Sequence, residues 1–319
     1  MSQTRTFDPA GLLFGVAVPA LAASTGLLLT RMWQQRLPAA IATHWTGETP
    51  DGFTTLWSAA WTFAIVIVLI GGGAAAIAAL AGGLLMMRRT MLIVGLTVVG
   101  LMFAIWVALL LAHLDLATAE GARLPTSSIG VGVLAGAAVG LLGAALLRDY
   151  RPRTPATDRP DASLPRGPLD LPIVDRRGLG TGTTAVLVAI GAAITLGLCR
   201  LAGSWWLLAI FLPVCVLVVG LLRFRVTVDV NGIRIYNMGM CALDYRVEEL
   251  VGARVGEVTP FKDFGGWGLR IKGRGNYGLV TDTGPALMLT AANGQRLTVS
   301  TDRAEQMAGA LNALADAAR

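Results

Sequence analysis

Six long apolar runs constrain this chain of 319 residues more than any other feature. They cover roughly residues 10–30, 58–83, 91–112, 128–147, 182–199 and 204–222. No Asp, Glu, Lys, Arg or His interrupts any of them, and an uncharged apolar run of about 18 or more residues is long enough to cross a bilayer. The sequence therefore predicts a membrane α-helical bundle of about six transmembrane helices, with the lipid bilayer as its first partner.

Arginine placement predicts how these helices are oriented. The basic groups are Arg88-Arg89, the arginines of 148–180, and Arg223 with Arg225. If all six runs span, these groups lie on one side, which the positive-inside rule makes the cytoplasm. Both termini are then cytoplasmic, and the outward segments are 31–57, 113–127 and 200–203. This topology also explains the net charge of +6 without nucleic acid as a partner.

The same pattern divides the chain into four parts. They are a four-helix transmembrane unit (1–147, with the outer loop 31–57), a Pro/Arg-rich cytoplasmic linker (148–181), a transmembrane hairpin (182–223) and a cytoplasmic domain (224–319). Only four residues separate the fifth and sixth runs, which predicts a tight hairpin; a re-entrant fifth run is the alternative. Gly132, Gly136 and Gly140 share one helix face, and we expect them to pack within the bundle rather than form a homodimer.

The outer loop holds the residues that we expect to bind a ligand or to fix the loop. They are Pro38, His44, Trp45, Glu48, Pro50, Asp51 and Gly52. Pro50-Asp51-Gly52 predicts a turn, and His44 is expected to hydrogen-bond that turn at Asp51. The alternative is a cation site made by His44, Glu48 and Asp51 with His113 and Asp115. The structural role is favoured, so neither a metal nor a cofactor is expected.

The loop also resembles a bacterial membrane family, domain of unknown function 1648. The shared positions are Leu37, Pro38, Ile41, His44, Trp45, Gly47, Pro50, Asp51 and Gly52. The resemblance extends from the first helix into part of the second. It implies a multi-pass protein of the bacterial cell membrane, and in one group of the family this module opens immunity proteins against a secreted peptide toxin.

After residue 223 the hydrophobic period changes to the alternation typical of strands. Short strands are predicted over 224–230 and 233–235 and near 243–246, 251–258, 267–272, 277–281, 285–290 and 295–300, with hairpin turns at Asn231-Gly232 and Asn293-Gly294. A helix over 302–317, with Asp302 and Glu305 as a capping box, follows them. The arrangement resembles bacterial PH-like domains, which implies an antiparallel β-barrel with one capping helix.

A basic patch is the candidate site of this C-terminal domain. Its members are Lys262, Arg270, Lys272 and Arg274. PH-like domains bind lipids, peptides or other proteins, so the resemblance implies a partner of that kind. The alternative is a solvated strand face, because the basic and acidic residues of the domain nearly balance.

These features favour a non-enzymatic membrane regulator or sensor, with the immunity role as the version that the family resemblance implies. The enzyme class is disfavoured because GxSxG, HExxH and paired intramembrane carboxylates are all missing from the sequence. The alternative function is a transporter or permease component for an apolar substrate, which the uncharged helices disfavour for ionic cargo.

Overall fold

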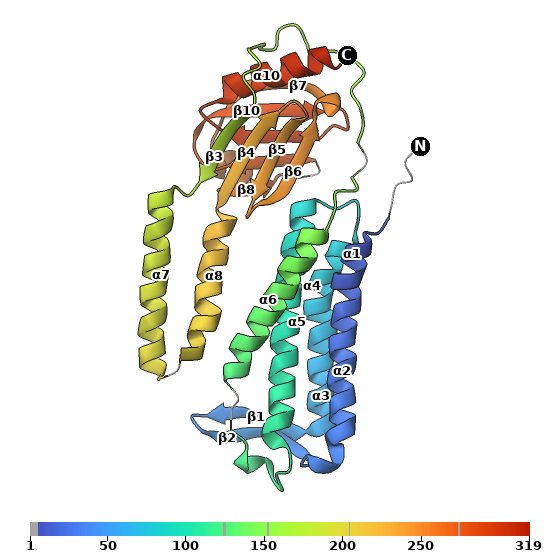
Figure 1. The fold of residues 1–319 in the computed structure, drawn as a ribbon, viewed down its shortest axis with the longest axis vertical. Coiled ribbons are helices and arrows are strands. Elements are labelled where there is room, and N and C mark those ends of the chain that lie inside the picture. Colours follow the sequence, from blue (N-terminus) through green and yellow to red (C-terminus); the bar gives the residue numbers. More distant parts are fainter. Residues whose placement is uncertain (1–5, 124–125, 152, 204, 274) are drawn as a thin grey trace. The chain divides into compact units, whose positions relative to one another are not determined.

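The computed structural model describes residues 6–123, 126–151, 153–203, 205–273 and 275–319. The chain forms two compact units, Met1–Arg151 with Ile190–Cys215, and Pro152–Ala189 with Val216–Arg319. Figure 1 shows the helices and strands that build them. The first unit holds most of the helical bundle, and the second holds the C-terminal sheets.

Helices of the first unit join end to end into long apolar segments. The first segment comprises α1 (Pro9–Leu12), the π-helical η1 (Leu13–Ala17), α2 (Val18–Trp33) and η2 (Gln34–Arg36). The second comprises α3 (Leu56–Ile65), the π-helical η3 (Val66–Gly72), α4 (Gly73–Ala76) and η4 (Ile77–Ala79). They are followed by α5 (Leu85–His113), the short η5 (Ala119–Gly121) and α6 (Ser127–Leu146).

Within the described residues, five helical segments are long and apolar enough to cross a membrane. They are Pro9–Arg36, Leu56–Ala79, Leu85–His113, Ser127–Leu146 and Thr181–Leu201, the last being part of α7 (Thr181–Ala202). The sixth expected run is shorter, because η6 (Trp205–Leu207) precedes a 14-residue α8 (Leu208–Leu221). Five such helices indicate a multi-pass membrane protein.

Small residues let α5 and α6 approach closely, as the sequence predicts. A Cβ atom added to Gly132 would lie 2.7 Å from the carbonyl oxygen of Gly100, and one on Gly140 would lie 2.8 Å from the Cα of Ile93. Gly136 likewise meets the backbone of α5 at Leu96. The glycine face is therefore covered inside this chain, which confirms packing within the bundle.

The outer loop folds into a two-stranded sheet, β1 (Ala40–Thr46) and β2 (Thr49–Thr55). The predicted turn at Pro50-Asp51-Gly52 is wrong, because these residues belong to β2 and pair with β1. The chain turns at Gly47-Glu48 instead, where Gly47 has a φ of +65°, a conformation that glycine adopts without strain. Pro50 is tolerated in β2 because the strand has a free edge.

The second unit contains two sheets and a C-terminal helix. The first sheet has the order β3 (Ile173–Gly178), β4 (Arg223–Asp229), β5 (Gly232–Asn237) and β6 (Met240–Arg246). The second has the order β7 (Leu250–Val258), β10 (Gly284–Ala291), β11 (Arg296–Ser300), β9 (Asn276–Val280) and β8 (Gly268–Ile271). Both Asn-Gly turns and the C-terminal helix α10 (Ala304–Ala317) are confirmed.

The expected closed barrel is wrong for the part of the chain that the structure describes. Hydrogen-bonded pairing stops at β3 and β6 in one sheet and at β7 and β8 in the other. The short helix η7 (Val247–Glu249) stands between β6 and β7 and passes the chain from one sheet to the other. In addition, β9 and β11 run parallel rather than antiparallel.

Part of the expected linker 148–181 belongs to the fold of the second unit. Residues 173–178 form β3, which pairs with β4 along its whole length. Upstream, Arg153 forms ion pairs with Asp244 at 2.8 Å and with Glu249, and Arg166 pairs with Asp316 at 2.9 Å. The proline-rich composition suggested a free segment, but arginine contacts hold it against the domain.

Candidate functional site

The outer hairpin carries a small polar cluster around Asp51. His44 Nδ1 lies 2.6 Å from Asp51 Oδ1, and the Thr46 hydroxyl donates to Asp51 Oδ2. These bonds, with the Thr46 hydroxyl first, hold the pKa of Asp51 below its usual value. The predicted contact between His44 and Asp51 is confirmed, although it joins two strands rather than a turn.

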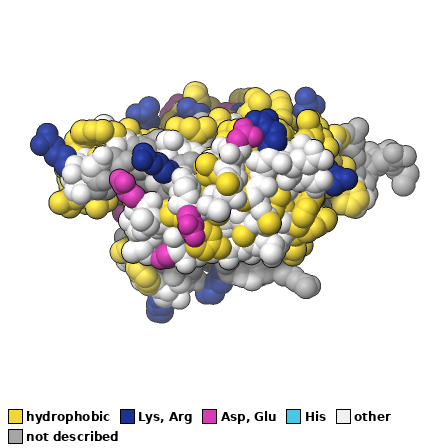
Figure 2. Space-filling model, turned by 90° about the horizontal axis from the view of Figure 1, so that it is seen from below, with side chains coloured by type: hydrophobic (Ala, Val, Ile, Leu, Met, Phe, Trp, Pro, Cys, Tyr) yellow, Lys and Arg dark blue, Asp and Glu magenta, His cyan; other side chains and the backbone are white. Residues whose placement is uncertain are grey.

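The other predicted loop residues lie outside the polar cluster around Asp51. Pro38 is buried, Glu48 is exposed at the turn, and Trp45 donates its indole N–H to the carbonyl of Ala122 at 3.1 Å. Gly52 pairs with His44, where a Cβ would come within 2.8 Å of the histidine Cβ. These residues shape the hairpin and attach it to the bundle. Seen from below in Figure 2, acidic and basic side chains are scattered among apolar ones.

The proposed completion of a cation site by His113 and Asp115 is wrong. His113 Nδ1 donates to the Leu109 carbonyl at 2.8 Å, and its Nε2 accepts the Ala42 N–H at 2.9 Å. Asp115 pairs with Arg36 at 2.6 Å, which lowers the pKa of the carboxyl. Among the described residues, no three His, Cys, Asp or Glu side chains gather in a way that would hold a metal. His113 thus fastens β1 of the hairpin to α5, and Asp115 holds the end of η2 that precedes the hairpin.

The basic patch of the second unit includes two aromatic residues that sequence analysis missed. Lys262 lies on α9 (Pro260–Phe264), Arg270 on β8 and Lys272 just beyond it, and all three are exposed. Arg274 lies outside the described residues. Phe261 and Trp267 meet edge to face at 4.7 Å, and each remains more than half exposed. Phe261 directly precedes Lys262 in the sequence, and this adjacency could have indicated an aromatic residue beside the patch.

A buried ion pair in the bundle was also missed. Arg88 and Asp8 are both fully enclosed and contact each other directly. Arg88 also donates to the carbonyls of Ala78 (3.0 Å) and Arg148 (2.9 Å), while Asp8 caps the first turn of α1 through Ala10 N–H. The pair therefore links the starts of α1 and α5 to η4 and to the end of α6. Asp8 before Pro9 was a visible capping signal, but its partner lies 80 residues away.

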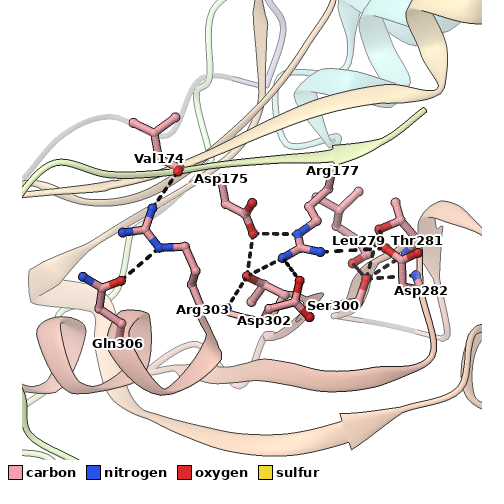
Figure 3. Close-up of polar contacts among 11 residues, drawn as sticks. Val174, Asp175, Arg177, Leu279, Thr281, Asp282, Ser300, Asp302, Arg303 and Gln306 are labelled. Atoms are coloured by element: carbon pink, nitrogen blue, oxygen red, sulfur yellow. Dashed lines mark hydrogen bonds and ion pairs between the residues drawn. The ribbon is translucent and has the colours of Figure 1, made fainter. Parts of the chain in front are cut away.

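A second network surrounds Arg177 on β3 (Figure 3). Arg177 pairs with Asp175 at 2.6 Å and with Asp302 at 3.0 Å, and Thr301 donates to Asp175 at 2.5 Å. The predicted capping box is wrong because Asp302 pairs with Arg177, and Arg303 occupies the N-cap position without a side-chain capping bond. The Arg303 guanidinium donates instead to Gln306 Oε1 and to the Val174 carbonyl, both at 2.9 Å. The network links β3 to the loop that leads into α10.

Two features join the helical hairpin to the first sheet, a buried asparagine and a closely packed glycine. The Asn237 side chain donates to the carbonyls of Gly220, Leu221 and Arg223 at 3.1, 3.2 and 2.9 Å, which satisfies the end of α8. Gly178 has a φ of +92° and lies against the carbonyl of Leu222, which leaves no space for a Cβ. Two residues therefore separate β3 from α7 and one separates α8 from β4, and the Leu179 N–H donates to the Leu222 carbonyl between the two connections at 3.2 Å.

Comparison with known proteins adds no relative, since no family model, curated protein or solved structure matches the chain significantly. The resemblance to domain of unknown function 1648 and the PH-like origin of the C-terminal unit therefore stay predictions. The class that the fold itself indicates is a multi-pass membrane protein with a two-sheet C-terminal unit.

Proposed function

We propose that this protein is a non-enzymatic regulator or sensor of the bacterial cell membrane. In this proposal the β1–β2 hairpin faces outward and meets a peptide or another ligand. The second unit lies in the cytoplasm with both termini and engages a partner there. One candidate span precedes the hairpin and four precede β3, which supports opposite sides for the hairpin and β3. Because β3 pairs with β4, the rest of the second unit lies on the side of β3, which requires the chain to cross back after the fifth candidate span.

The observation that carries the proposal is the direct junction between α7–α8 and β3–β4. Gly178 pairs with Arg223 at the end of the ladder, and Asn237 fixes the last carbonyls of α8. A displacement of the helical hairpin must therefore move the paired strands with it. Such a rigid connection suits a protein that passes a conformational change from the membrane to a β-domain.

The proposal is tested by making the junction flexible in the living cell. A deletion strain is complemented with the native chain or with a chain that carries a Gly-Ser-Gly-Ser insertion between Gly180 and Thr181. The matched control places the same insertion between Asn293 and Gly294, in a hairpin turn away from the junction. For a sensor, the native chain and the control restore the transcript profile, whereas the junction insertion does not.

The result that contradicts the proposal is a deletion that alters no transcript, or a junction insertion that works as well as the native chain. A deletion that changes only the uptake of an apolar compound into vesicles supports the transporter alternative. The immunity version has its own test, the sensitivity of the deletion strain to peptides encoded beside the gene. Unchanged sensitivity to all of them removes that version.

A further inference from the structure

A groove of about 590 Å³ lies where the first sheet meets the helical hairpin. Its walls come from the end of β3, the start of α7, the end of α8, the strands β4 and β5, and the turn between β5 and β6. The groove falls entirely within Pro152–Ala189 and Val216–Arg319, which form one compact unit. Its volume is typical of small-molecule sites, which occupy about 300–1,000 Å³.

Three exposed arginines line this groove: Arg176, Arg223 and Arg225. Arg176 pairs directly with Arg225 across the β3–β4 ladder, and Arg223 lies two positions before Arg225 on β4. All three side chains therefore leave the same face of the sheet, since alternate strand residues share a face. Directly paired residues have Cβ atoms about 5 Å apart, so the charges are close.

No carboxylate neutralises these arginines in the part of the chain that the structure describes. Arg177 also lines the groove, but Asp175 and Asp302 already pair with it. Arg225 lies over the Tyr236 ring at 4.7 Å from its centroid. Like charges directly opposite each other destabilise a strand pair, so this arrangement favours an anion between the guanidinium groups.

The start of α7 adds backbone donors to the same groove. Gly180 and Thr181 line it, and the first turn of this 22-residue helix contains no acidic side chain. Unpaired N–H groups and the helix dipole make such an end favourable for phosphate. Arginine is also the side chain best shaped for bidentate phosphate binding.

The position of the groove distinguishes among anions. Because α7 is apolar enough to cross a membrane, its first residues lie at the depth of the lipid headgroups. Leu179 and Met238 give the groove an apolar border. A phosphate that carries acyl chains fits both parts of this site, whereas a free phosphate ester leaves the apolar border unused.

We infer that this groove binds the phosphodiester headgroup of an anionic phospholipid, such as phosphatidylglycerol. Arg176, Arg223 and Arg225 hold the phosphate, and the start of α7 contributes backbone N–H groups. The site differs from the basic patch at Lys262, and it does not depend on the proposed sensor role. Binding without any effect on transcripts leaves the lipid site intact while contradicting the sensor.

The test is a lipid titration of the full chain in neutral detergent, followed by native mass spectrometry. Phosphatidylglycerol is compared with phosphatidylcholine for the native protein and for the variant Arg176→Gln/Arg223→Gln/Arg225→Gln. The matched control, Lys262→Gln/Arg270→Gln/Lys272→Gln, removes the same charge from the other patch. Each arginine near an anionic lipid contributes about fivefold in affinity, so the groove variant is expected to bind phosphatidylglycerol about 100-fold more weakly.

Two further measurements test for a folding defect and for binding of a free phosphate ester. The conservative variant Arg176→Lys/Arg223→Lys/Arg225→Lys retains the charge and is expected to recover much of the binding, which excludes a folding defect as the cause. Glycerol 3-phosphate in solution is expected not to displace the lipid. The inference is overturned if phosphatidylcholine binds equally well, if both Gln variants lose binding equally, or if glycerol 3-phosphate competes at the same concentration as the lipid.

Discussion

Replacing Gly132 by Ala offers the sharpest test of how the bundle is held together. The new Cβ would lie 2.7 Å from the Gly100 carbonyl oxygen and 2.8 Å from both the Ala104 Cβ and the Leu101 Cα. Carbon–oxygen contacts across helix interfaces normally measure about 3.3–3.6 Å. The α5 and α6 backbones must therefore separate by about 0.6 Å or more, which weakens dispersion contacts along their whole interface.

The expected cost follows from known effects of overpacking. Insertion of a methyl group into a packed interior costs about 1–3 kcal/mol, while Gly to Ala in an open helix stabilises by up to about 1 kcal/mol. Gly73 supplies the matched control, because it has helical dihedrals of −60° and −45° and nothing lies within 4 Å of an added Cβ. The helix-propensity gain applies at both positions and cancels in the comparison, so Gly132→Ala is expected to be about 1–3 kcal/mol less stable than Gly73→Ala.

The assay is unfolding of the full chain in detergent micelles by titration with sodium dodecyl sulfate, monitored by circular dichroism. Both variants are compared with the native chain at the same protein-to-detergent ratio. If Gly132→Ala unfolds at the same midpoint as Gly73→Ala, the close approach of α5 and α6 does not stabilise the bundle and the reasoning fails.

Three other perturbations test separate parts of the structure. Arg88→Met leaves Asp8 buried without its partner and is expected to cost about 3–5 kcal/mol in the same titration, whereas adding Asp8→Asn to it should restore part of the loss. Asn237→Ala removes the donor at the end of α8 and is expected to lower stability by about 1–3 kcal/mol, with faster hydrogen exchange in 220–223 as the distinguishing measurement. The pKa of Asp51 is lowered in the folded chain, so its carboxylate stabilises the hairpin fully above the ordinary carboxyl pKa of about 3.9 and loses this effect as pH falls through the folded pKa. The difference in melting temperature between the native chain and Asp51→Asn is therefore expected to disappear only in acid. A difference that persists in acid contradicts this role of Asp51.

Local patterns in the sequence were sufficient to predict most elements of the fold. Five apolar runs became long helices, because uncharged stretches of this length have few alternatives. The two Asn-Gly turns and the strands around them were also predicted, since both depend on neighbouring residues. The sixth run, 204–222, was predicted as one long helix, but α8 begins only at Leu208. Hydropathy does not indicate where a helix begins within an apolar run.

The features that sequence analysis missed depend on partners far along the chain. β3 lies in a proline-rich segment and becomes a strand by pairing with residues 223–228, on the other side of the helical hairpin. The outer turn was misplaced because Pro50-Asp51-Gly52 has turn composition, yet pairing with β1 determines its conformation. The Arg88 and Arg177 contacts were missed for the same reason.

The β3–β4 ladder also constrains how this protein is made. A ribosome releases β3 before α7 and α8, so the strand has no partner until both helices have been synthesised and β4 follows them. If only one of the two helices inserted, β3 and β4 would end on opposite faces of the bilayer and both would expose unpaired backbone groups. Completion of the first sheet therefore requires an even number of crossings between residues 179 and 222, so a chain that inserts only one of the two helices cannot complete this domain.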